Sequence, residues 1–412
     1  MIKEKHSHID ADEEQKRHLD LEKEFQSKNK ALNIVLTVSF FAFIYVFALL
    51  FWILPDRDVS AEENRALASA PEFSFESLAD GSYTSKFATY MADQFPARNF
   101  FVNLKAASEA ALLKGENNGV IFAKDGYLVK RFDTVDTETV EKNISNICEF
   151  ASALEDAGID VTVAAAGREV DVAESVLPAA YGTDSSDAMW SAIDGAFSKG
   201  NIKYVDLKTP LKESFDKGEY VYYRTDHHWT SYGAYLAYGI LAKEMGFAPS
   251  DKDSFRRETV TDKFHGTTWS SAGASWISPD SIEFFRFDGD DKLTTDRQDE
   301  KFDGLYKTSY LEEKDKYSAF LGGNAARIDV RSSGAEREKL LVIKDSFFHS
   351  LAPFFAEKYD LVIIDMRYFT GSAAMLCKDE GIDKVLVLLN AETLGEECGL
   401  GRLKMGLAVL GD

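Results

Sequence analysis

The stretch Leu340-Leu341-Val342-Ile343-Lys344-Asp345-Ser346 joins a short apolar run to a polar turn, and a helical pattern follows from Phe347 to Tyr359. A second apolar run, Leu361-Val362-Ile363-Ile364, comes directly after that pattern. Continuous apolar runs interleaved with helices are typical of parallel strands that are covered on both faces. These residues therefore predict an α/β fold with a mainly parallel sheet.

The same alternation continues on both sides of this stretch. Further helices and strands are predicted at residues 140–157, 160–166, 187–198, 203–206, 373–379 and 384–389, after a hairpin at 117–129. Residues 248–335 are polar and break the alternation, which indicates a long insertion with its own strands or loops. Within this insertion, residues 264–271 could lie over a site, although a surface loop is the commoner meaning of such glycine and serine residues.

A short segment, Thr225-Asp226-His227-His228-Trp229-Thr230, carries the side chains best suited to catalysis. Residues 221–223 predict a strand that leads into it, and residues 230–246 have helical spacing with a glycine in the position of a C-terminal cap. We therefore expect the Asp-His-His at the mouth of a strand and against a helix N-terminus, where free N–H groups favour a carboxylate. In an Asp-x-His pair, the carboxylate can orient one ring nitrogen while the other faces a nucleophile.

Ser346 is the predicted nucleophile, because it lies where a buried strand ends and a helix begins. At such a turn the backbone N–H groups that follow can hold an oxyanion. Ligands bind at the C-terminal ends of strands in open α/β sheets, so Ser346, Asp226 and His228 are expected at one edge. His228 would then take the proton from Ser346, and Asp226 would fix the tautomer of His228. The alternative is a serine that only caps the helix.

Other residues are expected to support this site or to bind substrate. One of two adjacent histidines usually packs or bonds to backbone, so His227 is expected to support rather than to catalyse. Arg367 either binds an anionic or hydroxylated substrate at the same sheet edge or forms a surface salt bridge. Asn324 either donates to an oxyanion or occupies a turn. The complete supporting set is His227, Trp229, Lys344, Asp345, Phe347, Arg367, Asn324 and Tyr223.

The composition narrows the possible partners. The 412 residues carry a formal net charge of -22, which argues against nucleic acid or an anionic membrane surface, since either needs clustered Lys and Arg. The three cysteines, Cys148, Cys377 and Cys398, are too few for a disulfide framework and lack metal-ligand spacing. Cys148 is expected to be a buried thiol, and a Cys377–Cys398 bridge stays open as an alternative. No metal or other cofactor is expected.

Residues 32–54 contain no charged side chain and are long enough, at about 1.5 Å per residue, to cross a hydrocarbon core of roughly 30 Å. They predict one transmembrane helix, because the run is too long for a cleaved signal peptide. Lysine and arginine are more frequent before this span than directly after it, so the N-terminus is expected inside and the C-terminal part outside. The predicted parts are a cytoplasmic tail (1–30), a transmembrane helix (31–54), a stalk that packs on the catalytic domain (55–115), and an α/β domain (116–412) with an insertion at about 248–335.

Four motifs resemble those of the bacterial DHHW family, which in turn resembles the SGNH-hydrolase-like domains of the alginate O-acetylation proteins. The motifs are Thr225–Thr230, Lys344–Phe347, Glu63–Arg65 and Asp93–Arg98. The resemblance covers roughly residues 55–410 and implies a flavodoxin-like three-layer sandwich, a triad of Ser346, His228 and Asp226, and acyl ester chemistry on a cell-envelope glycan. In this chain the serine follows Lys-Asp instead of lying in a Gly-x-Ser setting, so its oxyanion hole is expected to be built differently.

Three functions are compatible with these residues. The first is a membrane-anchored, extracytoplasmic O-acyltransferase or O-acetyl esterase that modifies an envelope glycan or exopolysaccharide, with a membrane-bound partner as acyl donor. The second is a metal site made by Asp226, His227 and His228 with His265 or His349, although adjacent histidines seldom ligate the same ion. The third is a non-catalytic envelope protein that binds a glycan or a partner.

Overall fold

The computed structural model describes residues 3–60, 65–334 and 337–411. The described residues divide into two compact units, one made of residues 3–60 and 65–101 and the other of residues 102–334 and 337–411. Glu63 and Asn64, which belong to one of the four motifs, lie outside the described residues.

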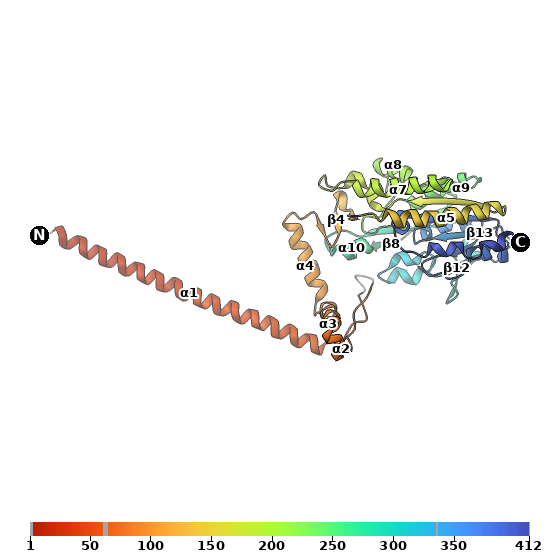
Figure 1. Cartoon of the computed structure of the whole chain (residues 1–412). Helices are drawn as coiled ribbons and strands as arrows, with labels where there is room; N and C mark the ends of the chain where they lie inside the picture. The colour runs from red at the N-terminus through yellow and green to blue at the C-terminus, as the bar shows by residue number, and fades with distance from the viewer. Residues whose placement is uncertain (1–2, 61–64, 335–336, 412) are drawn as a thin grey trace. The chain divides into compact units, whose positions relative to one another are not determined.

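The first unit contains α1 (Lys3–Ile53), a single long helix (Figure 1). Within the described part of the chain, it is the one helix that is long and apolar enough to cross a membrane, by length and composition. The other elements of this unit are β1 (Val59–Ser60), β2 (Arg65–Ala66), α2 (Phe75–Ala79) and α3 (Ser82–Asp93). Phe51 of α1 lies edge-on to Tyr90 of α3, with ring centroids 5.5 Å apart.

The first two residues of the Asp93–Arg98 motif form hydrogen bonds within this unit. The Asp93 carboxylate accepts from the backbone N–H of Ala68 at 2.9 Å. The Gln94 side-chain amide donates to the carbonyl oxygens of Arg57 at 2.9 Å and Ala68 at 3.0 Å. Both side chains therefore hold neighbouring turns of the first unit together.

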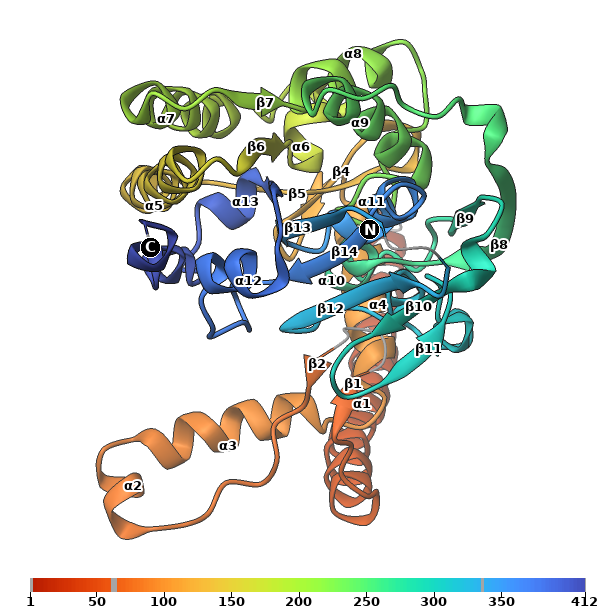
Figure 2. The same cartoon turned by 90° about the vertical axis from the view of Figure 1, so that its right-hand side faces the viewer.

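Eight strands form the central sheet of the second unit, in the order β11-β10-β12-β14-β13-β15-β6-β7 (Figure 2). The five strands from β14 to β7 run parallel, whereas β11, β10 and β12 add antiparallel neighbours beside β14. The parallel strands are β6 (Asp160–Ala166), β7 (Tyr204–Asp206), β13 (Lys339–Lys344), β14 (Asp360–Ile364) and β15 (Lys384–Asn390). The antiparallel strands are β10 (Leu293–Asp296), β11 (Lys301–Asp303) and β12 (Arg327–Ser332).

Helices cover both faces of this sheet. Alternate residues of β13 enter two separate cores, with Leu340 and Val342 in one and Leu341 and Ile343 in the other. The first core includes side chains of α8 (Lys208–Asp216), α9 (Ser231–Glu244) and α11 (Phe348–Ala356). The second includes side chains of α5 (Thr137–Asp156), α7 (Asp184–Gly200) and α12 (Ala373–Glu380). The predicted three-layer α/β fold with a mainly parallel sheet is confirmed.

One predicted strand is wrong. Residues 221–223 lie in a loop, where Tyr222 and Trp229 form only an isolated bridge. The loop is closed by hydrogen bonds from Thr230 N to Val221 O and from Tyr223 N to His228 O. Val221, Tyr222 and Tyr223 are fully buried in the core, which explains their strand-like composition.

The insertion at residues 248–335 contributes to two sheets. Its β8 (Arg256–Phe264) and β9 (Asp280–Arg286) pair with each other, and α10 (Thr267–Ala272) lies between them in the chain. Its later strands, β10, β11 and β12, extend the central sheet. The hairpin predicted earlier in the chain is confirmed as β4 (Val120–Phe122) and β5 (Leu128–Lys130), next to the short β3 (Glu116–Asn117).

All three cysteines are buried and free. The Cys398 thiol donates to the carbonyl oxygen of Thr393 at 3.3 Å. The alternative of a Cys377–Cys398 bridge is therefore not what the structure contains. Burial raises the pKa of both thiols.

Glu380, in the last turn of α12, forms ion pairs with residues of two strands, β12 and β13. Its carboxylate lies 2.5 Å from Arg327 Nη2, 3.0 Å from Arg331 Nη2 and 3.2 Å from Lys339 Nζ. Burial opposes the charge, but the hydrogen bonds from Arg327 and Lys339 prevail and lower the pKa of Glu380 to about 2. Because its ordinary pKa is 4.5, ionised Glu380 stabilises the fold above pH 4.5, and this contribution is lost as the pH falls toward 2.

Glu380→Gln is therefore expected to lower the free energy of unfolding by about 1–3 kcal/mol at neutral pH, with the partial exposure of the carboxylate reducing the effect. The difference from wild type should shrink as the pH falls below 4.5. Urea unfolding at pH 7 and pH 3 measures it, with the exposed Glu155→Gln as control. A difference that stays constant with pH would contradict this role.

Candidate active site

Asp226, His228 and Ser346 form a continuous chain of hydrogen bonds. Asp226 Oδ1 lies 2.5 Å from His228 Nδ1, and His228 Nε2 lies 2.7 Å from Ser346 Oγ. Asp226 and His228 are buried, whereas Ser346 is half-buried. The structure thus brings together the three residues that the sequence singled out, with the imidazole between the carboxylate and the hydroxyl.

Ser346 lies in the turn between the end of β13 and the start of α11. The N-cap residue of α11 is Phe347 and no side chain caps the helix, so Ser346 does not have the capping role that was the alternative. The turn is held by Asp345, whose Oδ1 accepts from Phe347 N at 3.0 Å and whose Oδ2 accepts from Asn390 N at 2.6 Å. Asp345 therefore fixes the turn to the end of β15.

The backbone N–H groups after Ser346 are engaged within this turn. Phe347 N donates to the Asp345 carboxylate, Phe348 N to the carbonyl oxygen of Asp345, and His349 N to the carbonyl oxygen of Ser346. The expectation that these groups hold an oxyanion is thus not met in this geometry.

Asp226 is oriented by the start of α10. Its Oδ2 accepts from the backbone N–H of Thr267 at 2.8 Å and from the Thr267 hydroxyl at 3.1 Å. A Cβ on Gly266 would lie 2.2 Å from the Asp226 Cβ, so only glycine fits there. Burial raises the pKa of Asp226, but His227, His228 and the Thr267 N–H outweigh it and hold this pKa well below its usual range.

The helix N-terminus beside Asp226 is therefore not the predicted one. The helix that follows the Asp-His-His begins at Ser231 and is capped by Thr230, whose hydroxyl accepts from Gly233 N at 3.1 Å. The donor to Asp226 comes instead from Thr267, in a segment whose glycine and serine residues are more typical of a surface loop.

Aromatic rings hold the His228 imidazole in place. The Tyr317 ring is nearly parallel to it, with centroids 4.0 Å apart and planes 10° apart. The Tyr317 hydroxyl donates to the carbonyl oxygen of Ser346 at 3.2 Å and lies 3.1 Å from Ser350 Oγ. Phe347 contacts the imidazole with centroids 5.1 Å apart. Tyr317 thus links the histidine to the nucleophile turn, and nothing in the local sequence marks it for this position.

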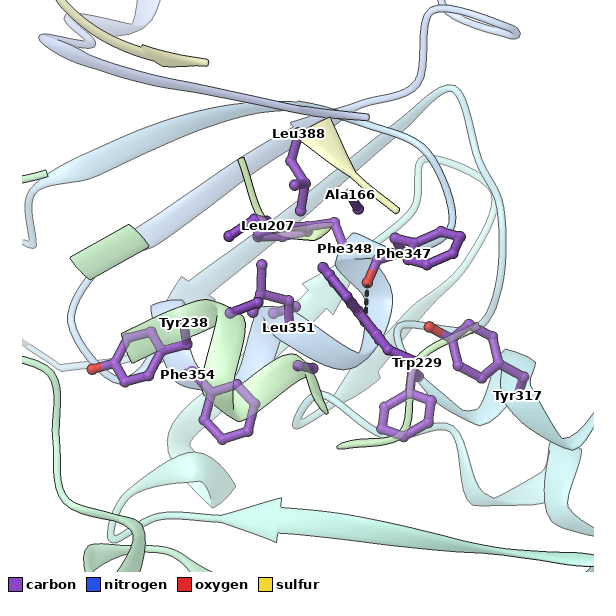
Figure 3. Packing of buried hydrophobic residues seen from close by; sticks show 14 of the residues in the cluster. Ala166, Leu207, Trp229, Tyr238, Tyr317, Phe347, Phe348, Leu351, Phe354 and Leu388 are labelled. Carbon is purple, nitrogen blue, oxygen red and sulfur yellow. Dashed lines mark hydrogen bonds between the residues drawn. The ribbon is translucent and has the colours of Figure 1, made fainter. Parts of the chain in front are cut away.

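Trp229 joins the Asp-His-His loop to the same turn. Its Nε1 donates to the carbonyl oxygen of Phe347 at 3.1 Å, drawn as a dashed line in Figure 3, and lies 2.9 Å from Ser350 Oγ. Tyr223 is buried against Phe264, with ring centroids 5.2 Å apart. Trp229 and Tyr223, two members of the predicted supporting set, therefore pack in the core beside the site.

A buried charge cluster lies behind the nucleophile turn. Lys344 Nζ is 2.8 Å from His349 Nε2, 3.1 Å from Asp365 Oδ2 and 3.4 Å from Asn324 Oδ1. Burial lowers the pKa of Lys344 despite the attraction of Asp365. Burial, together with the nearby Lys344, also holds the pKa of His349 well below its ordinary value, so His349 can accept the hydrogen bond.

Arg367 belongs to this cluster. Its Nε and Nη2 lie 2.9 Å and 2.7 Å from the Asp365 carboxylate. Its Nη2 is also 3.5 Å from Asn324 Oδ1. Of the two roles predicted for Arg367, the salt bridge is the one that the structure contains. The Asn324 amide oxygen faces Lys344 and Arg367, so that oxygen serves the charge cluster.

Replacing Asp365 by asparagine is expected to lower the free energy of unfolding by about 3–5 kcal/mol, because it leaves the charge of Lys344 buried without its counterion. Chemical unfolding measures the loss. The exposed Asp383→Asn, in the turn before β15, is the control and should change stability by less than about 0.5 kcal/mol. Equal stability of the two variants would show that Lys344 does not depend on Asp365.

His227 supports the site from the other side. Its ring contacts that of His228, with centroids 3.8 Å apart and planes tilted by 38°, and its Nδ1 lies 2.7 Å from Thr267 Oγ1. About a third of the side chain, 32%, is exposed. Burial and the neighbouring His228 lower the pKa of His227 to about 4.

Asp226, His227 and His228 are also the residues that would form the alternative metal site. One ligand atom from each of Asp226, His227 and His228 lies within 4.8 Å of the others. Both ring nitrogens of His228 are, however, engaged by Asp226 and Ser346. His265, which bonds to the carbonyl oxygen of Ile277, and His349, which bonds to Lys344, point to other partners. The geometry therefore favours a triad over a metal centre.

Comparison with known proteins agrees with the fold and the motifs. Residues 120–303 match the family described as "ALGX: SGNH hydrolase-like domain, acetyltransferase AlgX". A "Probable alginate O-acetylase AlgJ" of Pseudomonas syringae pv. tomato is 28% identical over 181 residues, which cover 42% of this chain and 44% of the relative. The corresponding protein of Azotobacter vinelandii is 25% identical over 195 residues, or 44% of this chain and 48% of the relative. The chain thus matches less than half the length of these relatives.

Solved structures share the architecture. A DHHW family protein from Eubacterium siraeum aligns with a TM-score of 0.57 and 21% identity, covering 70% of this chain and 95% of that protein. Bacillus cereus PatB1 with a sulfonyl adduct aligns with a TM-score of 0.56 and 18% identity, covering 69% and 99%. The chain therefore has the SGNH hydrolase-like fold, and it is similar to the SGNH hydrolase-like domains of the alginate O-acetylation proteins and, in fold, to a DHHW family protein.

Proposed function

We propose that the protein is an O-acyltransferase or O-acetyl esterase that acts on a cell-envelope glycan or an exopolysaccharide. The observation that carries this proposal is the hydrogen-bonded chain from Asp226 through His228 to Ser346. The names of the relatives, probable alginate O-acetylases, support the acyl group and the class of acceptor.

The three residues have distinct roles in this proposal. His228 Nε2 takes the proton of Ser346 Oγ as that oxygen attacks the acyl carbon of the donor. The imidazolium, stabilised by Asp226, then gives the proton to the departing oxygen, and an acyl ester of Ser346 remains. In the second half, a sugar hydroxyl or water attacks this ester while His228 Nε2 takes its proton. His228 then gives that proton to the departing Ser346 Oγ, which restores the free serine and the neutral imidazole. Exclusion of water decides between transfer and hydrolysis.

The N-terminal helix supplies the anchor in this proposal. With residues 31–54 spanning the membrane, the charged tail at residues 1–30 lies in the cytoplasm and the α/β domain outside. Residues 55–115 then act as a stalk for a catalytic domain that spans residues 116–412. A membrane-bound partner supplies the acyl group, since the sequence contains no nucleotide-binding loop for a cytoplasmic donor.

Covalent labelling tests the proposed nucleophile directly. Phenylmethanesulfonyl fluoride should form a sulfonate ester on Ser346, with loss of fluoride, and should abolish acetate release from p-nitrophenyl acetate in the same proportion. Peptide mass spectrometry locates the adduct, and Ser350, buried one helical turn later, serves as the internal control. An unlabelled Ser346 in a protein that still releases acetate would refute the proposal.

A further inference from the structure

A polar groove of about 370 Å³ opens beside the triad. It is lined by residues from the hairpin of β4 and β5, from α10 and from α13 (Ala391–Leu394). Those that matter here are Lys130, His227, Thr267, Thr268, Ser271 and Glu392. Three of them, Thr267, Thr268 and Ser271, lie in the segment that the sequence places over the site or in a surface loop, and His227 was expected to support the site. Nothing in the sequence marks Lys130 or Glu392 for this position.

The groove is connected to the triad through His227 and Thr267. His227 lines the groove with about one-third of its side chain exposed, while its ring contacts that of His228. Thr267 lines the groove and also donates twice to Asp226. A molecule bound in the groove is therefore separated from the general base by a single layer of side chains.

The charges around the groove are balanced. Lys130 forms an ion pair with Glu392, which itself lines the groove. Arg131 is the other basic residue in the lining. Its Nη1 lies 2.5 Å from Glu116 Oε2, and its Nε lies 2.9 Å from Asp133 Oδ1. Each cation thus already has a carboxylate partner.

The net negative charge of the chain also disfavours an anionic glycan. The net charge of -22 opposes the approach of a polyanion. A polyuronate carries a carboxylate on every sugar, and its binding would require unpaired cations that these pairs do not provide.

The lining offers hydrogen bonds suited to hydroxyl groups. The Lys130 and Glu392 side chains, 50% and 25% exposed, present donors and an acceptor side by side. Ser271, at the exposed surface of α10, adds a hydroxyl group to the lining. A sugar hydroxyl both donates and accepts, so it can satisfy such a mixed set without bringing a charge.

We propose that this groove is the acceptor subsite and that it takes an uncharged, hydroxyl-rich glycan chain in preference to a polyuronate. This inference rests on the proposed acyl transfer for its role, but glycan binding in the groove can be measured without any ester chemistry.

The binding test uses full-length Ser346→Ala, which keeps the groove and lacks the nucleophile. Titration calorimetry compares cellotetraose, an uncharged tetrasaccharide, with tetramannuronate. Cellotetraose should bind at least tenfold more tightly, and its affinity should change little between low and physiological salt. Tighter binding of tetramannuronate, or equal affinities, would overturn the inference, and so would no binding of either sugar.

A second variant locates the binding. Ser271 lines the groove at the exposed surface of α10, so Ser271→Trp fills the groove. This change should weaken cellotetraose binding at least tenfold and should lower the ratio of acetyl transfer onto cellotetraose to hydrolysis of p-nitrophenyl acetate by a similar factor. The control is Ser198→Trp, on the exposed face of α7. Unchanged binding and ratio in Ser271→Trp would remove the groove from acceptor recognition.

The proposed acyl chemistry and the proposed acceptor subsite can be refuted independently of each other. Hydrolysis of p-nitrophenyl acetate without binding of cellotetraose would overturn the acceptor subsite and leave the triad standing. Binding of cellotetraose that Ser271→Trp abolishes, in a wild-type protein that releases no acetate, would overturn the acyl chemistry and with it the acceptor role of the groove.

Discussion

Ser346→Ala is expected to lower the rate of acetate release by on the order of 10⁴- to 10⁶-fold. The change removes the oxygen that attacks the acyl carbon, and it leaves His228 Nε2 without the hydroxyl that now lies 2.7 Å away. No acyl ester of the protein can form, so only the slow direct attack of water is left. Release from p-nitrophenyl acetate and from an acetylated sugar should fall together, because both pass through the same intermediate.

The fold should tolerate this change. The turn is held by hydrogen bonds from Phe347 N and Asn390 N to the Asp345 carboxylate, and none of these involves the Ser346 hydroxyl. The thermal midpoint should therefore match that of wild type and of the exposed control Ser198→Ala. Wild-type rates in a folded Ser346→Ala protein would exclude the proposed enzyme.

Asp226→Asn is expected to lower the same rate by about 10³- to 10⁴-fold. An asparagine has one oxygen and one NH₂ group, whereas both carboxylate oxygens of Asp226 now face donors: His228 on Oδ1 and Thr267 on Oδ2. An NH₂ group turned toward His228 favours the tautomer whose Nε2 carries the proton and cannot accept one from Ser346. An NH₂ group turned toward Thr267 meets a backbone N–H group, which displaces the side chain and the imidazole that it orients.

Both orientations therefore damage the general base while the nucleophile stays intact. Sulfonyl labelling of Ser346 should slow along with acetate release, which distinguishes this variant from one that only weakens substrate binding. Asp262→Asn, on the exposed side of β8, is the matched control. An Asp226→Asn protein that kept wild-type rates would show that the carboxylate does not orient His228.

The fold could be predicted where strands are buried on both faces. Residues 340–343 and 361–364 are continuous apolar runs, because each of their side chains enters one of the two cores. Residues 221–223 have a similar composition for another reason, since their buried side chains belong to a loop that packs into one core. Apolar composition reports burial, and it does not separate a sheet strand from a buried loop.

The candidate site could be predicted only where chemistry restricts the residue type. A carboxylate, an imidazole and a hydroxyl in the pattern of Asp226, His228 and Ser346 are recognisable without coordinates. Tyr317 and Thr267 act through position, one by stacking on an imidazole and the other by offering a backbone N–H group. Many residue types could lie at either point of the sequence, and only the course of the insertion brings these two to the triad.

The two outermost strands of the central sheet, β7 and β11, are each three residues long. An edge strand exposes unpaired backbone N–H and C=O groups that can pair with a strand from another molecule. Edge strands this short expose few such groups, so two copies of the domain have little opportunity to pair edge strand to edge strand. High local concentration on a crowded surface should therefore carry little risk of fibril-like association through this sheet.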